Sequence, residues 1–157
     1  MIFVTLGTHE QPFDRALDLV AGLGGRDELL VQHGATQARP ALPHIEWLDY
    51  LDWEPLTAWM RDAEVVITHA GVGSAVTAIR AGKKPVLVPR LARFGEHVDD
   101  HQLQLAERLA DFDLAVTCGP GDRLDGAVAK ARATVARPLA AHQSRLARAV
   151  AQAALDD

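Results

Sequence analysis

Three polar segments of the chain carry residue types that could bind a ligand or transfer a proton. They are residues 7–11 (Gly-Thr-His-Glu-Gln), residues 69–74 (His-Ala-Gly-Val-Gly-Ser) and residues 90–102, which end in Glu-His-Val-Asp-Asp-His-Gln. Each follows a short apolar run of the kind typical of a buried strand. Because ligands of open α/β sheets sit beyond the carboxyl ends of the strands, we expect the three segments to lie together there.

The second segment has the composition of an anion site at the start of a helix. Gly71 and Gly73 would let the backbone approach a ligand closely, and the free N–H groups of a first helical turn attract anions. The same pattern fits an ordinary strand-to-helix turn with Ser74 as the N-cap, and the residues alone leave both interpretations open. The dinucleotide fingerprint is excluded because Val76 stands where its third glycine would be. The glycine-lysine pattern of a phosphate loop is also absent.

The third and first segments each allow two interpretations. Asp99 followed three residues later by Gln102 is a helix-capping pattern, in which the carboxylate accepts from free N–H groups. The nine-residue polar loop before it, 90–98, favours a functional site, and one residue can cap while others face a ligand. In the first segment, the imidazole of His9 can exchange a proton near neutral pH. A single polar residue after a first strand is nevertheless more often solvated or capping than catalytic.

Residue spacing disfavours several other kinds of site. The histidines lack the spacing of a zinc site and Cys118 stands alone, so we expect no metal and no disulfide. The Gly-x-Ser-x-Gly motif of a serine nucleophile is absent. The candidate basic residues are few and could form a solvated face; they are Lys83, Lys84, Arg90 and Arg93.

The composition is that of an ordinary globular domain. Of the 157 residues, 48% are apolar and 24% are charged. A net charge of −5 gives no general attraction to nucleic acid or to an anionic membrane. The apolar N-terminal run is too short for a signal peptide, and no run approaches the roughly 20 apolar residues of a membrane span. We therefore expect a cytoplasmic protein, unless a partner holds it at a membrane.

Apolar runs alternate with helical patterns along the chain. The expected strands are 2–6, 28–32, 45–48, 64–68, 85–89 and 114–117; the expected helices are 12–23, 54–61, 75–81 and 99–109, then two alanine-rich helices separated at Pro138. Continuous apolar strands separated by helices predict a parallel sheet covered on both faces. The expected fold is an α/β, Rossmann-like three-layer sandwich formed by a single domain, 1–157.

The three segments, in this order, resemble the C-terminal domain of family 28 glycosyltransferases. The likeness rests on residues 2–13 (IFVTLGTHEQPF), on 67–74 (ITHAGVGS) with 82–89 (GKKPVLVP), and on 94–102 (FGEHVDDHQ). The chain is most similar to the small subunits of split UDP-sugar transferases of bacterial exopolysaccharide synthesis. It is also similar to the catalytic subunit of the dolichol-pathway N-acetylglucosaminyltransferase. The likeness is clear over the first hundred or so residues and poor in the C-terminal helices.

This resemblance implies one half of a two-domain GT-B glycosyltransferase, which binds a UDP-sugar as its donor substrate. The other half would bind the acceptor and usually supply the catalytic base. In split relatives that half is a separate, membrane-associated chain, and the acceptor is a lipid-linked saccharide or a polysaccharide precursor. The implied reaction is displacement with inversion at the anomeric carbon, without a metal. The chain would then act in the cytoplasm, recruited to the inner face of the membrane by its partner.

The resemblance also assigns residues to the expected donor site. Carried over by position, these are Gly7, Thr8, Gly71, Val72, Gly73, Ser74, Asp99, Asp100, His101 and Gln102. His9 is the expected acid–base residue, if this half of the enzyme supplies one. Many relatives place a glutamate where this chain has Thr77, and that carboxylate accepts from both ribose hydroxyls. A single hydroxyl cannot accept in the same way, so either Thr77 binds ribose more weakly or another acidic residue, such as Glu96, takes over.

Two other functions remain open from the sequence. The chain could be a non-catalytic subunit that enhances a glycosyltransferase partner, or a small-ligand binding module on the same scaffold. The three segments favour the donor-binding subunit, whereas Thr77 keeps the enhancer alternative open.

Overall fold

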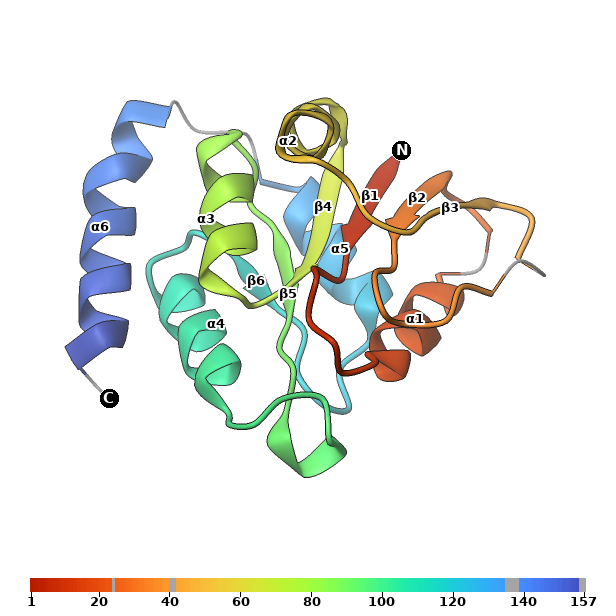
Figure 1. Cartoon of the computed structure of the whole chain (residues 1–157). Coiled ribbons are helices and arrows are strands. Elements are labelled where there is room, and N and C mark those ends of the chain that lie inside the picture. Colours follow the sequence, from red (N-terminus) through yellow and green to blue (C-terminus); the bar gives the residue numbers. More distant parts are fainter. Residues whose placement is uncertain (24, 40–41, 135–138, 156–157) are drawn as a thin grey trace.

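In the computed structural model, six parallel strands form one sheet in the order β3-β2-β1-β4-β5-β6 (Figure 1). The structure describes residues 1–23, 25–39, 42–134 and 139–155. The strands are β1 (Ile2–Thr5), β2 (Leu29–Gln32), β3 (Ile45–Leu48), β4 (Val65–His69), β5 (Val86–Val88) and β6 (Val116–Thr117). The chain order reverses between β1 and β4, which are paired neighbours. In open α/β sheets, this switch point is where a crevice for ligands opens.

Strand β1 shows why the apolar runs become central strands. Side chains of a strand point alternately to the two faces of the sheet. Ile2 and Val4 pack into the core on one face, whereas Phe3 packs into the core on the other, and all are fully buried. A strand between two apolar layers therefore needs an unbroken apolar run rather than an alternating one.

Helices cover both faces of the sheet and complete a three-layer sandwich (Figure 1). One face packs against α1 (Asp14–Ala21) and α5 (Leu124–Arg132). The other packs against α2 (Trp53–Asp62), α3 (Val72–Arg80) and α4 (His101–Asp111). Helix α6 (Leu139–Leu155) lies outside α3 and α4 and contacts both. The expected α/β, Rossmann-like parallel sandwich is confirmed.

At the amino ends of the strands, α5 is tied to the sheet by ion pairs. The last residue of the helix, Arg132, pairs with Asp27 before β2 and with Glu64 before β4. We call Asp27, Glu64 and Arg132 the amino-edge cluster. All three side chains are partly exposed.

The four helix starts predicted from the sequence differ from the observed ones by one to three residues: α1 begins at Asp14 rather than at residue 12, and α2 at Trp53 rather than at residue 54. Helix α3 begins at Val72, three residues earlier than expected, because Gly71 is extended and the helix follows at once. Helix α4 begins at His101, two residues later than expected. There the carboxylates of Asp99 and Asp100 accept from backbone N–H groups, which competes with helical geometry. The expected break at Pro138 lies outside the described residues.

No helix in the described ranges is long and apolar enough to cross a lipid bilayer.

Candidate functional site

The three polar segments meet around one cavity at the carboxyl ends of β1 and β4, with a volume of about 760 Å3. The site residues expected from the sequence that line it are Gly7, Thr8, His9, Gly73, Ser74 and Gln102. The strands also contribute Thr5, Gln32 and His69, and the segment before and into α2 contributes Leu51 and Leu56. The cavity therefore has a polar side next to α3 and an apolar side next to α2.

The start of α3 presents unpaired backbone donors to this cavity. Gly71 is the N-cap, and no side chain caps the helix. The first backbone bond of the helix joins the N–H of Ala75 to the carbonyl of Gly71, so the N–H groups of Val72, Gly73 and Ser74 have no helical partner. The expectation that Ser74 could be the N-cap is wrong, because Ser74 lies inside the first turn. Free amides and the helix dipole favour an anion here.

His69, the last residue of β4, is neutral and fixed in one tautomer. Burial, and next the charge of Arg90, lower the pKa of His69 from 6.5 to about 4. Its Nδ1 accepts from the N–H of Gly71 at 3.0 Å, so in the neutral ring Nε2 carries the proton. Nε2 lies 3.1 Å from Oγ of Ser74 and therefore donates to it. The hydroxyl proton of Ser74 then remains available to donate into the cavity.

Three positions around the cavity are occupied by glycine for different physical reasons. The His69 ring occupies the space that a Cβ would need at Gly7 and at Gly71. Gly7 also has a φ of +77°, which favours glycine. A Cβ at Gly73, by contrast, would meet no protein atom within 4 Å. Gly73 therefore keeps open the space beside the first turn of α3.

The first loop places an imidazole pair at the opening of the cavity. His9 is exposed, and its ring stacks on that of His97, with centroids 5.0 Å apart and an interplanar angle of 24°. Nε2 of His9 lies 2.8 Å from Oε1 of Gln11. With Nε2 donating to this oxygen, Nδ1 of His9 keeps its lone pair and is the atom that could accept a proton.

Of the four residues 99–102, Gln102 lines the cavity and the others support the loop. Oε1 of Gln102 accepts from the N–H of Arg90, so its Nε2 faces Nδ1 of His69 at 3.3 Å. The carboxylate of Asp99 lies next to both His97 and His101, and its hydrogen bond with the His101 side chain is the main cause of its lowered pKa. Asp99 does accept from the first helical N–H, but Gln102 does not complete the expected capping box.

Thr77 and Glu96, the two candidates for ribose, have other contacts. The hydroxyl of Thr77 donates to the carbonyl of Gly73 at 2.7 Å, and Thr77 lines a separate cavity of about 190 Å3 with Trp53. Glu96 is buried, and its two oxygens accept from Arg15 at 2.9 and 2.8 Å. Because both carboxylate oxygens are engaged, the structure gives no support to Glu96 as a ribose ligand.

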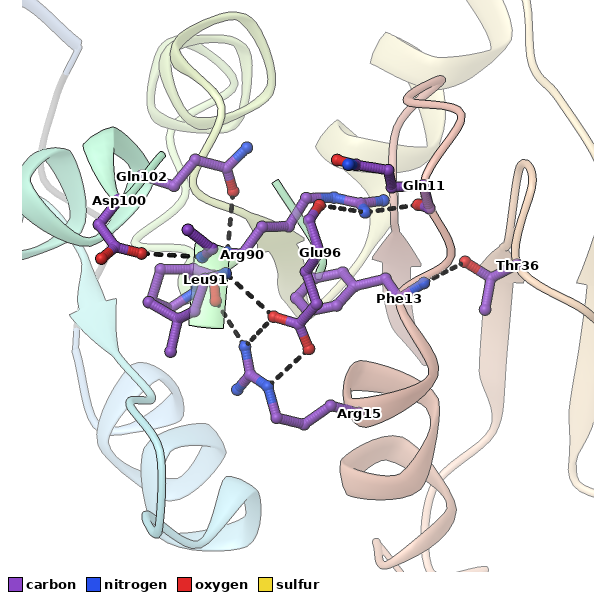
Figure 2. A network of polar contacts seen from close by, with 11 residues as sticks. Gln11, Phe13, Arg15, Thr36, Arg90, Leu91, Glu96, Asp100 and Gln102 are labelled. Carbon is purple, nitrogen blue, oxygen red and sulfur yellow. Dashed lines mark hydrogen bonds and ion pairs between the residues drawn. The ribbon is translucent and has the colours of Figure 1, made fainter. Parts of the chain in front are cut away.

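The sequence did not predict the burial of Arg90, which is the most buried of the lysines and arginines in the described ranges. Arg90 was expected on a solvated face, but its residue surface is only 1% exposed. Its guanidinium lies 4.6 Å from the ring centroid of Phe13 and donates to carbonyls of two loops (Figure 2). We call Arg15, Arg90 and Glu96 the carboxyl-edge cluster. No periodic pattern predicts it, since its members come from segments up to 81 residues apart.

Within the described parts of the chain, no group of three or more His, Cys, Asp or Glu side chains is arranged so that it could hold a metal ion.

Solved glycosyltransferases share this fold. The chain superposes on a glycotransferase of kitacinnamycin with a TM-score of 0.69 and 20% identity, covering 98% of this chain and 42% of that one. It superposes on CalG4, the calicheamicin glycosyltransferase, with a TM-score of 0.64 and 19% identity, covering 97% of this chain and 38% of that one. The fold is therefore that of one half of a GT-B glycosyltransferase.

Two sequence comparisons agree with this fold. The chain is 31% identical over 124 residues to the UDP-N-acetylglucosamine transferase subunit ALG13 of Yarrowia lipolytica, covering 69% of this chain and 60% of the relative. The sequence model of the glycosyltransferase family 28 C-terminal domain matches residues 1–155. A match over nearly the whole chain shows that this protein belongs to the family of glycosyltransferase family 28 C-terminal domains.

Proposed function

We propose that this chain is the donor-binding subunit of a two-component glycosyltransferase and takes a UDP-sugar into the cavity at the start of α3. The observation that carries the proposal is the open space beside Gly73, where unpaired N–H groups and the Ser74 hydroxyl converge. These groups all donate, as a diphosphate requires. The name of the Yarrowia lipolytica relative, a UDP-N-acetylglucosamine transferase subunit, supports both the class of donor and the presence of a partner.

In the proposed reaction, an acceptor oxygen attacks the anomeric carbon of the donor sugar from the side opposite the diphosphate. The bond between that carbon and the phosphate oxygen breaks, UDP leaves with the bonding electrons, and the acceptor proton passes to a base. The first turn of α3 and Ser74 would stabilise the charge that develops on the departing diphosphate, so the proposal needs no metal. The base is a residue of the partner or Nδ1 of His9.

The proposed partner is a membrane-associated subunit that binds a lipid-linked saccharide or polysaccharide precursor and recruits this chain to the cytoplasmic face of the membrane. The chain spans 42% and 38% of the two solved glycosyltransferases, which leaves room in each for another half. The purified chain alone should therefore transfer no sugar. Steady transfer to a lipid-linked acceptor by this chain without any partner would contradict the proposal.

Calorimetric titration with UDP, and with ADP and GDP as controls, tests the donor site directly. UDP should bind in the presence of EDTA and more tightly than the two purine nucleotides. Gly73→Val should abolish binding, because the side chain would fill the space beside the first turn, while circular dichroism shows the fold retained. An unchanged affinity for UDP in a folded Gly73→Val variant would place the donor elsewhere and favour the enhancer alternative.

Single side-chain changes then separate the parts of the site. Ser74→Ala should cost about 0.5–1.5 kcal/mol of UDP binding, and more if the bond to phosphate is charge-assisted. Thr77→Glu should tighten UDP if the ribose lies beside Thr77. In the assembled complex, His9→Ala should lower turnover by roughly a hundredfold if His9 is the base. A loss of only a few-fold would assign the base to the partner.

A further inference from the structure

Arg90 connects both loops that border the opening of the cavity, although it does not line the cavity itself. Its Nη1 donates to the carbonyl of Gln11 at 2.7 Å (Figure 2). Its Nη2 donates to the carbonyl of Leu6 at 3.1 Å. These two carbonyls flank the cavity-lining residues 7–10. The same Nη1 donates to the carbonyl of Glu96 at 3.2 Å, directly before His97. One guanidinium therefore fixes the backbone on both sides of the first loop and at one point of the third.

The charge of this guanidinium is compensated locally. Burial lowers the pKa of Arg90 to about 10, and the nearby Glu96 carboxylate opposes this shift, so the side chain stays charged at neutral pH. Glu96 in turn accepts from Arg15 and from the N–H of Leu91 at 3.0 Å. A buried charge with a nearby counter-charge and several hydrogen bonds is costly to remove, because its partners then remain buried without it. The carboxyl-edge cluster therefore gives the two loops a rigid common support.

The His9–His97 stack joins the two loops that Arg90 connects. Each ring is held mainly from its own loop: His9 contacts Gln11, and His97 lies next to Asp99. A stack of two rings from different loops persists only if the two backbones keep their relative position. The carbonyls of Gln11 and Glu96, two residues after His9 and one before His97, bind the same nitrogen atom of Arg90.

We propose that Arg90 is a positioning residue, which aligns the His9–His97 pair at the opening of the cavity without touching the ligand. The proposal rests on the proposed function only in taking the cavity to be the donor site. The alignment itself can be measured in the isolated chain without any nucleotide. Failure of the positioning role and failure of the donor site are therefore distinguishable.

Arg90→Lys is the decisive variant, because lysine keeps the charge but loses the planar fork that reaches the three carbonyls together. In the parent, NMR of the histidine-labelled chain should show a nuclear Overhauser effect between the His9 and His97 rings and displaced ring resonances. In Arg90→Lys, this effect should vanish and both resonances should move to those of exposed imidazoles. Arg93→Lys, on the same loop but exposed, is the matched control and should leave the pair unchanged.

The resonance of His69 serves as an internal reference for the fold. It should stay in place in Arg90→Lys, because His69 contacts Gly71, Ser74 and Gln102, and Gln102 binds the backbone N–H of residue 90. The affinity for UDP should fall less than tenfold, because His69 holds the anion site at the start of α3 and only Gly7 and Thr8 of the expected donor site lie on the loop that Arg90 fixes. A folded Arg90→Lys chain that keeps the His9–His97 effect would overturn the proposal. A loss of UDP affinity above tenfold in that variant would also overturn it, because Arg90 would then act on the anion site.

A second variant keeps the test decisive if Arg90→Lys does not fold. In Arg90→Gln/Glu96→Gln, the buried cation and the nearby carboxylate are neutralised together, so Glu96 does not remain as a buried charge. Arg15 loses its ion pair in this variant, but its side chain is 21% exposed and can be solvated. The proposal expects this variant to fold and to lose the His9–His97 effect. Retention of the effect in the folded double variant would contradict it.

Discussion

The two arginine-centred clusters lie at opposite edges of one sheet and have opposite environments. In the carboxyl-edge cluster, Arg90 is buried, donates mainly to backbone carbonyls, and has its pKa lowered by burial. In the amino-edge cluster, Arg132 is partly exposed, pairs with two carboxylates, and has its pKa raised by hydrogen bonds with Glu64 and Asp27. The buried arginine fixes the shape of loops, whereas the exposed one only attaches a helix. Arginine side chains therefore have different tasks at the two edges.

The largest expected difference between the edges is in stability. Arg90→Met should lower the free energy of unfolding by about 3–5 kcal/mol, because it leaves Glu96 with less charge compensation and removes the donor of three carbonyls, two of them in buried contacts. Urea unfolding followed by circular dichroism measures the loss. A loss below about 1 kcal/mol would mean that the two clusters do not differ in their contribution to the free energy of unfolding.

A smaller effect should come from His69, which gives the carboxyl edge a pH dependence. Its folded pKa of about 4 lies below the ordinary 6.5, so the unfolded chain takes up this proton first as the pH falls. The stability associated with the neutral ring is complete above pH 6.5 and is lost progressively between 6.5 and 4. The maximum loss is about 3 kcal/mol.

His69→Asn should flatten this dependence, since Asn can still accept from the N–H of Gly71 but does not titrate. Urea unfolding at pH 7 and at pH 5 compares the two chains. An equally steep loss of stability in His69→Asn would assign the proton uptake to other groups.

A still smaller effect is expected at the amino edge. Arg132→Ala should lower the free energy of unfolding by about 0.5–1 kcal/mol, because exposed ion pairs contribute little. Added salt should reduce the difference between variant and parent further. Thermal unfolding at two salt concentrations is a sufficient measurement, and a salt-independent loss of several kcal/mol would show that Arg132 also acts in the core.

The finest comparison uses two helical glycines, Gly73 in α3 at the carboxyl edge and Gly126 in α5. A Cβ at either position meets no protein atom within 4 Å. Replacement by Ala should therefore stabilise each helix by up to about 1 kcal/mol. Calorimetry should show that Gly73→Ala weakens UDP at least tenfold while Gly126→Ala leaves UDP binding unchanged. Equal affinities in the two variants would mean that the open space beside Gly73 has no role in binding UDP.

The sequence predicted the sheet well because buried parallel strands need unbroken apolar runs. The expected strand 64–68 is β4 shifted by one residue, and the expected strand 2–6 is β1 with one residue more. The sequence also predicted that the three polar segments lie together, because the carboxyl ends of parallel strands are at one edge of the sheet. Helix starts were less predictable, because the side chains of Asp99 and Asp100 compete with helical hydrogen bonds locally.

The parts of the site that could not be predicted depend on long-range contacts. Nothing in the local pattern distinguishes Arg90 from the exposed Arg93, since the carbonyls that bind Arg90 come partly from residues 79 and 84 positions away. Leu51 and Leu56 line the cavity only because the segment before and into α2 crosses the end of the sheet. Such residues have no periodicity that a reader of the sequence could recognise.

The position of the His69 ring also limits the order in which substitutions can accumulate. Because the ring fills the space of a Cβ at both Gly7 and Gly71, neither glycine can become alanine while the histidine remains. A smaller residue at 69 would make alanine acceptable at Gly71, whose backbone is extended. It would not do so at Gly7, where the positive φ still disfavours any side chain. Substitutions at these positions are therefore epistatic: Gly71→Ala is acceptable after a smaller residue has replaced His69, but not before.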